Sequence, residues 1–193
     1  MSDSKTIISV IAIFINLVGY APYIRDTLKG RTTPHIYSWL IWAFVTGTVF
    51  ALQVSAGAGV GAWVSFVVAA ICFLIFLLGL KSGKKNITMS DTACLILAFI
   101  ALFLWLVVRQ PVLSIMFLVS GDLLGFVPTV RKAWVKPYSE TLFLFESNVL
   151  SNGLGVLALQ KYNIVTWLYP VGWTVANLLF CIMLIIRRNQ VGK

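Results

Sequence analysis

The chain has 193 residues, of which 60% are hydrophobic and 11% are charged, and its net charge is +9. Soluble domains hold about 25% charged residues, so this composition excludes an ordinary water-soluble fold and predicts a protein that folds in lipid. The basic residues are scattered among short connections between apolar runs. We therefore attribute the positive charge to membrane orientation and expect no nucleic acid partner.

Seven apolar segments follow one another along the chain, at about 6–23, 35–55, 60–80, 92–108, 112–130, 141–159 and 164–186. A helix needs roughly 20 apolar residues to cross the hydrocarbon core of a bilayer. Glycine, proline and lysine mark the short connections, and no segment has the pattern of a strand. The sequence therefore predicts an all-α membrane protein with seven transmembrane helices.

Cysteine and histidine residues give no sign of a metal or cofactor site. Cys72, Cys94 and Cys181 all fall inside apolar runs, where they resemble small buried residues. The single histidine, His35, stands at the start of the second apolar segment and has no second candidate ligand nearby. We expect no metal, no cofactor and no disulfide framework.

The orientation follows from the distribution of lysine and arginine. Twelve of these residues lie in the connections after the first, third and fifth segments and in the C-terminal tail. Three lie on the other side, namely Lys5, Arg109 and Lys161. Because basic loops stay in the cytoplasm, we expect the N-terminus outside and the C-terminus inside. Short loops and the lack of an organellar sorting signal favour a bacterial inner membrane.

An internal repeat relates the two halves of the chain. Residues 16–25 align with residues 122–131 at a constant offset of 106, which superposes Leu on Leu, Gly on Gly, Pro on Pro and Arg on Arg. The helix order is then three, one, three, and an odd central helix makes the halves parallel. We expect a first three-helix bundle at 1–85, a linker helix at 86–111 and a second bundle at 112–193.

This pattern resembles the SWEET and PQ-loop transporter superfamily, in which each three-helix bundle has a proline late in its first helix. Pro22 and Pro128 occupy that place, although Tyr23 and Thr129 follow them where the motif has Gln. Asn177 is similar to the substrate asparagine of SWEET proteins. The resemblance implies alternating access, with the two prolines as hinges. Read without the resemblance, they either weaken their helices locally or end them near the membrane surface.

Polar residues inside the spans are the candidate binding groups. Asp122 and Glu146 are the two acids within them, and a charge there costs about 2.5–3.5 kcal/mol on the lenient insertion scale. Burial disfavours the ionised form of a carboxyl, so both are candidates for proton coupling. Residues of several spans fall at similar depths or on shared helix faces. The predicted binding residues are Asn16, Tyr20, Trp39, Trp42, Asp122, Asn148, Asn152 and Asn177.

These features predict a transporter of a small polar solute that works by alternating access. Asp122 and Glu146 favour proton coupling or a cationic substrate, but sugars, amino acids, vitamins and nucleosides also fit an aromatic–amide cavity, and facilitative transport stays open. A non-transporting receptor or sorting protein of the same fold is the alternative, but it would need a deep basic residue to hold a ligand carboxylate. An enzyme is not expected, since no nucleophile–base pair is visible. The expected partners are the lipid bilayer and a small-molecule substrate, and the sequence leaves open a homo-oligomer.

Overall fold

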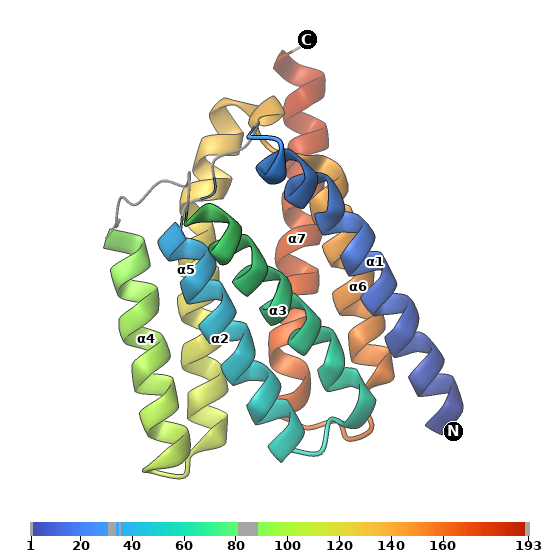
Figure 1. The fold of residues 1–193 in the computed structure, drawn as a ribbon, viewed down its shortest axis with the longest axis vertical. Helices are drawn as coiled ribbons and strands as arrows, with labels where there is room; N and C mark the ends of the chain where they lie inside the picture. Colours follow the sequence, from blue (N-terminus) through green and yellow to red (C-terminus); the bar gives the residue numbers. More distant parts are fainter. Residues whose placement is uncertain (1, 31–33, 35, 81–88, 192–193) are drawn as a thin grey trace.

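The computed structural model describes residues 2–30, 34, 36–80 and 89–191, with the side chains of a few of these left out. Within these ranges all of the regular secondary structure is helical and there is no strand (Figure 1). The α-helices are α1 (Ser2–Leu28), α2 (Ile36–Ser55), α3 (Ala62–Gly79), α4 (Met89–Leu106), α5 (Pro111–Val135), α6 (Leu142–Ala158) and α7 (Ile164–Val191). Two short 3₁₀ helices, η1 (Gly59–Gly61) and η2 (Pro137–Ser139), precede α3 and α6.

Several of these helices are suited to a bilayer. By length and composition, five of those described can cross a membrane: α1, α2, α3 together with η1, α5 and α7. Two shorter apolar helices accompany them, Leu95–Leu106 within α4 and Leu142–Ala158, which is α6. Large apolar side chains face outward, such as Phe14, which is 64% exposed. The expectation of a helical integral membrane protein is therefore confirmed at this level.

The helices run alternately up and down, so their connections gather at two ends (Figure 1). The N-terminus, the α2–α3 connection and the α6–α7 connection lie at one end, which we call the N-terminal end of the bundle. The end of α1 and the start of α6 lie with the C-terminus at the other, the C-terminal end. Helix α3 packs against α2 and α1, α7 packs against α6 and α5, α1 packs along α6, and α4 packs on α5.

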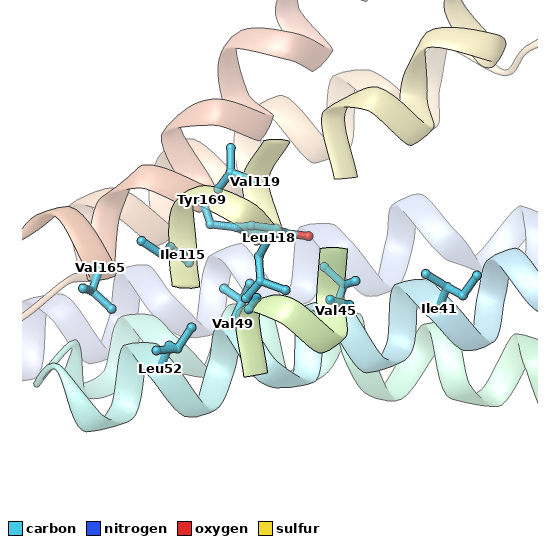
Figure 2. Packing of buried hydrophobic residues seen from close by; sticks show 11 residues of the cluster. Ile41, Val45, Val49, Leu52, Ile115, Leu118, Val119, Val165 and Tyr169 are labelled. Carbon is cyan, nitrogen blue, oxygen red and sulfur yellow. The ribbon is translucent and has the colours of Figure 1, made fainter. Parts of the chain in front are cut away.

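A cluster of buried aliphatic residues joins α2 to α4, α5 and α7 (Figure 2). Helix α2 contributes Ile41, Val45, Val49 and Leu52, which repeat at the spacing of one helix face. They meet Ile115, Leu118 and Val119 of α5, Ala98 and Ala101 of α4, and Val165 and Tyr169 of α7. Lipid is as apolar as these side chains, so close packing, and not removal from water, holds them together.

Small residues bring α1 and α6 close together. A side chain at Gly19 would place its Cβ 2.6 Å from Cβ of Ser147. About one turn further along α6, the Ser151 hydroxyl donates a hydrogen bond to the carbonyl of Ala12 at 2.9 Å. Small and hydroxylated residues allow membrane helices to approach closely and to hydrogen-bond, so this contact is tighter than large side chains would permit.

Candidate functional site

A cavity of about 460 Å³ lies between the helices. Its lining comes from α1, α2, α3, α5, α6 and α7. The deep part is lined by buried residues, among them Thr46, Ser65, Asp122, Tyr169 and Asn177. Half-buried residues line the part near the C-terminal end, namely Tyr23, Ser38, Thr129 and Glu140. The partial exposure of these four residues indicates that the cavity is open toward the C-terminal end of the bundle.

Asp122 is the central polar group of this cavity. It lies on α5, is 3% exposed, and one of its oxygens, Oδ2, accepts two hydrogen bonds from α7. The hydroxyl of Tyr169 donates at 2.6 Å and the indole Nε1 of Trp173 donates at 3.0 Å. The other oxygen, Oδ1, has no hydrogen-bond partner among the described residues. The position of Oδ2 is thus fixed by two hydrogen bonds, and Oδ1 remains able to accept a hydrogen bond from a further donor.

A hydrogen-bond chain continues from Asp122 to α2. The hydroxyls of Thr46 and Tyr169 are 3.4 Å apart. A phenol has one proton, and Tyr169 donates its proton to Asp122, so Thr46 is the donor in this second contact. The chain from Thr46 through Tyr169 to Asp122 therefore links α2 to α7 and α5 at the bottom of the cavity.

Aromatic rings make up much of the cavity wall. On α2, Trp39 and Trp42 meet edge to face with ring centroids 5.1 Å apart. The Trp39 indole also donates to the Tyr23 hydroxyl at 3.3 Å. On the other side, Phe126 of α5 meets Trp173 of α7 with ring centroids 5.4 Å apart. Aromatic rings of α2, α5 and α7 therefore line the cavity together with the carboxyl group of Asp122.

Amide groups provide the remaining polar surface. The side chains of Asn148 and Tyr20 form a hydrogen bond across α6 and α1. Asn152 and Asn177 each donate to a carbonyl one turn earlier in their own helices, at 2.9 and 2.7 Å. These internal bonds fix the amide orientation, which leaves the site rigid on this side.

The charge of the described lining is purely acidic. Asp122 lies deep in the cavity, Glu140 lies near its opening, and no lysine, arginine or histidine is among the described lining residues. This contrasts with the net charge of +9 on the whole chain. The described basic residues thus lie outside the cavity, and its described lining favours positive charge.

The structure brings together all but one of the residues predicted to bind substrate. Tyr20, Trp39, Trp42, Asp122, Asn148, Asn152 and Asn177 line the cavity. Asn16 does not line it: its side chain is fully buried, and neither polar atom of its amide has a hydrogen-bond partner among the described residues. Asn16 and Asp122, which the offset of 106 pairs, are both buried, but only the aspartate is among the described lining residues.

The other predicted functional residues lie outside the lining or outside the description. Glu146 is on the exposed side of α6 and is not among the described lining residues. Pro22 lies inside the continuous helix α1. Pro128 has helical backbone within α5, and its side chain, like the whole of His35, falls outside the part of the chain that the structure describes.

Two cavity residues, Tyr169 and Trp173, were missed by sequence reasoning although they hold Asp122. Together with Asn177 they recur every four residues along α7, so all three share one helix face. Extending the face that carries Asn177 toward the N-terminus of α7 would have found both. Glu140 was missed for a different reason, since it precedes α6 and belongs to no helical face.

Closure of the N-terminal end depends on glycine residues in the α2–α3 connection. Gly57 and Gly59 adopt positive φ angles of 83° and 62°, which glycine tolerates without strain. At Gly61, an added Cβ would lie 2.9 Å from the backbone nitrogen of Leu159 and 3.0 Å from its Cα. The main chain of η1 therefore crosses directly over the main chain of the α6–α7 connection.

Hydrogen bonds fasten this closed end. The backbone N–H of Gln160 donates to the carbonyl of Ala58 at 2.9 Å, and the amide of Asn163 donates to the carbonyl of Ala56 at 3.1 Å. From α1, the hydroxyl of Ser9 donates to the carbonyl of Val60 at 2.8 Å and Lys5 donates to the carbonyl of Leu159. The bonds of Gln160, Asn163 and Lys5 connect segments from opposite halves of the sequence, while that of Ser9 joins α1 to η1 within the first half, and together they close this end of the bundle.

A proline in α7 leaves a backbone carbonyl free to accept a further hydrogen bond from another helix. Pro170 lies inside α7 and has no N–H, so the carbonyl of Thr166 lacks its usual partner within the helix. The buried amide of Gln53 donates to that carbonyl at 2.9 Å, while the hydroxyl of Ser65 donates to the Gln53 oxygen at 2.8 Å. Gln53 thus fills a gap in the hydrogen bonding of α7 and joins it to α2 and α3.

Taken together, these observations define an all-helical integral membrane protein with an aromatic, acidic cavity that opens at one end. Comparison with models of protein families, with curated proteins and with solved structures finds no match for this chain.

Proposed function

We propose that this protein is a membrane transporter that moves a small polar solute by alternating access. The observation that carries the proposal is the cavity itself, which opens toward one end of the bundle and is closed at the other by hydrogen-bonded connections. A transporter of this kind exposes one central site to each side in turn. The volume of about 460 Å³ suits a small organic solute.

We further propose seven spans in the order three, one, three, as in the SWEET and PQ-loop superfamily, with bundles at 1–85 and 112–193 and a linker helix at 86–111. Matching contacts support this arrangement: α3 packs against α1 and α2 as α7 packs against α5 and α6, and α4 packs on α5. The basic connections favour a cytoplasmic C-terminal end in a bacterial inner membrane. The cavity would then open to the cytoplasm.

Alternation between the two states requires the bundles to rotate against each other. Opening the other side would separate the α2–α3 connection from the α6–α7 connection and break the hydrogen bonds between them. The chain from Thr46 through Tyr169 to Asp122 also crosses between the bundles. A ligand or proton that binds Asp122 would thereby alter the hydrogen-bond chain that joins the two bundles. Pro22 and Pro128 are the proposed hinges of the rotation.

The test uses accessibility, because it needs no known substrate. Asn148→Cys is made in a protein whose native cysteines are replaced by alanine, and it is treated with a membrane-impermeant thiol reagent in vesicles of either orientation. A transporter exposes this position in turn to both sides, so we expect labelling in both preparations. Leu150→Cys, at an exposed apolar position two residues away, serves as the unlabelled control.

Labelling of Asn148→Cys from one side only would contradict alternating access and would favour a receptor with a one-sided pocket. The acidic lining already argues against a receptor that holds a ligand carboxylate, because no basic residue is among the described lining residues. Labelling from neither side would contradict the proposed water-accessible cavity.

A further inference from the structure

We infer that the solute is an organic cation, an amine or guanidine with an apolar body, whose charged group is held by Asp122 between aromatic rings. This inference rests on the proposed transport function and specifies its substrate class. It is carried by the charge of the lining, the free carboxyl oxygen of Asp122 and the arrangement of the aromatic rings around it.

The charge of the lining selects for cations. Asp122 places a carboxyl group deep in the cavity, where its side chain is 3% exposed, and the described lining holds no basic residue beside it. An anionic solute would meet this buried carboxylate in surroundings that screen charge poorly. A neutral solute would bind the amides and leave the charge of Asp122 unpaired. A cation satisfies this charge.

The geometry at Asp122 leaves one acceptor for the ligand. Tyr169 and Trp173 both donate to Oδ2, so this oxygen and the plane of the carboxyl group are fixed. Oδ1 has no partner among the described residues, although the side chain is 3% exposed. Buried polar atoms are nearly always hydrogen-bonded. An N–H donor of an ammonium or guanidinium group would satisfy Oδ1 with a charge-assisted bond.

The aromatic walls suit the rest of a cationic molecule. Trp39 and Trp42 of α2 line the cavity together with Phe126 of α5 and Trp173 of α7. Cations are attracted to the faces of tryptophan and phenylalanine rings, and the same faces accept an apolar body. An inorganic metal ion fits less well, because the described residues contain no group of three His, Cys, Asp or Glu side chains that could hold one.

The experiment compares three probes that share one body and differ in charge: 3-phenylpropylamine, 3-phenylpropanol and 3-phenylpropionate. Binding to the purified protein is followed by tryptophan fluorescence, since Trp39, Trp42 and Trp173 line the cavity. We expect the amine to bind on the order of tenfold more tightly than the alcohol, and the acid to bind more weakly still. Equal affinity for the amine and the alcohol would overturn the inference.

Asp122→Asn should lower the affinity for the amine by on the order of tenfold or more and leave that for the alcohol unchanged. Glu146→Gln is the matched control, because it removes a carboxyl on the exposed side of α6, and amine binding should persist. If Asp122→Asn does not fold, Trp42→Leu gives a second test. It should weaken amine binding more than alcohol binding, and an equal loss for both would contradict the inference.

Uptake of the same probes into proteoliposomes separates this inference from the proposed function. Binding of the amine that depends on Asp122 but leads to no uptake would support the cation site and contradict transport. Uptake of the alcohol in preference to the amine would support transport and overturn the cation site. Uptake of protons alone, with no amine binding, would make Asp122 a proton carrier and also overturn the inference.

Discussion

Asn16 and Asp122 occupy equivalent places in the repeat, yet their surroundings differ. Asp122 has two donors on one oxygen, while the amide of Asn16 has no hydrogen-bond partner among the described residues. An unsatisfied buried polar group costs about 1–3 kcal/mol. The unpaired amide therefore weakens the state described here, and under the proposed alternating access we expect it to gain a partner in the other state.

The first prediction concerns Asn16→Leu, which replaces the unpaired amide with an apolar group of similar size. We expect the resistance of the purified protein to thermal denaturation to rise, by about 1–3 kcal/mol in unfolding free energy. Asn177→Leu is the control, because that buried asparagine already donates a hydrogen bond at 2.7 Å. A gain for Asn177→Leu equal to that for Asn16→Leu would show that the unpaired amide is not the cause.

Among the elements, the α2–α3 connection imposes the strictest steric limit. Gly61 touches the backbone of the α6–α7 connection, and a backbone cannot move aside as a flexible side chain can. The helix-interior glycine Gly47 gives a contrast, because nothing lies within 4 Å of an added Cβ there. The two glycines therefore have opposite expected responses to the same substitution.

The second prediction is that Gly61→Ala destabilises the protein by about 1–3 kcal/mol through overpacking. Gly47→Ala should instead stabilise it by roughly 0.5–1 kcal/mol, because alanine favours a helix interior over glycine. Thermal denaturation in detergent measures both variants. In the variant at Gly61, loosening of the closed end should also increase reaction of Ser9→Cys with a thiol reagent. Equal stability of the two variants would argue against a main-chain contact at Gly61.

At the scale of the whole molecule, the third prediction concerns topology. Lys136 and Lys161 are both exposed, and they belong to connections at opposite ends of the bundle. In intact cells, a single cysteine at 161 should react with an impermeant thiol reagent, and one at 136 should react only after permeabilisation. The reason is the excess of basic residues on the side of Lys136. The reverse pattern would invert the proposed orientation.

Much of the fold follows from local sequence, because lipid requires helices and the apolar runs have the length that helices need. The cavity residues on α2, α5 and α6 were also predictable, since each set follows a single helical face. The position of Asn16 was not, because it depends on how closely α1 approaches α6 at Gly19. The role of Gln53 depends on Pro170, more than a hundred residues away, and no local pattern connects them.

The hydrogen bonds across the closed end share one property: each ends on a main-chain carbonyl, whether the donor is Lys5, Ser9, Gln53, Gln160 or Asn163. A carbonyl is present whatever the side chain. Substitutions that keep the backbone path should therefore preserve these hydrogen bonds at the half-buried accepting positions Ala56 and Val60. Ala58 and Leu159 are fully buried and are also limited by packing, and the intervening glycines should resist change. The side chains at Ala56 and Val60 can therefore change while the closure is preserved. The closure depends on the path of the backbone and not on which side chains these two residues carry.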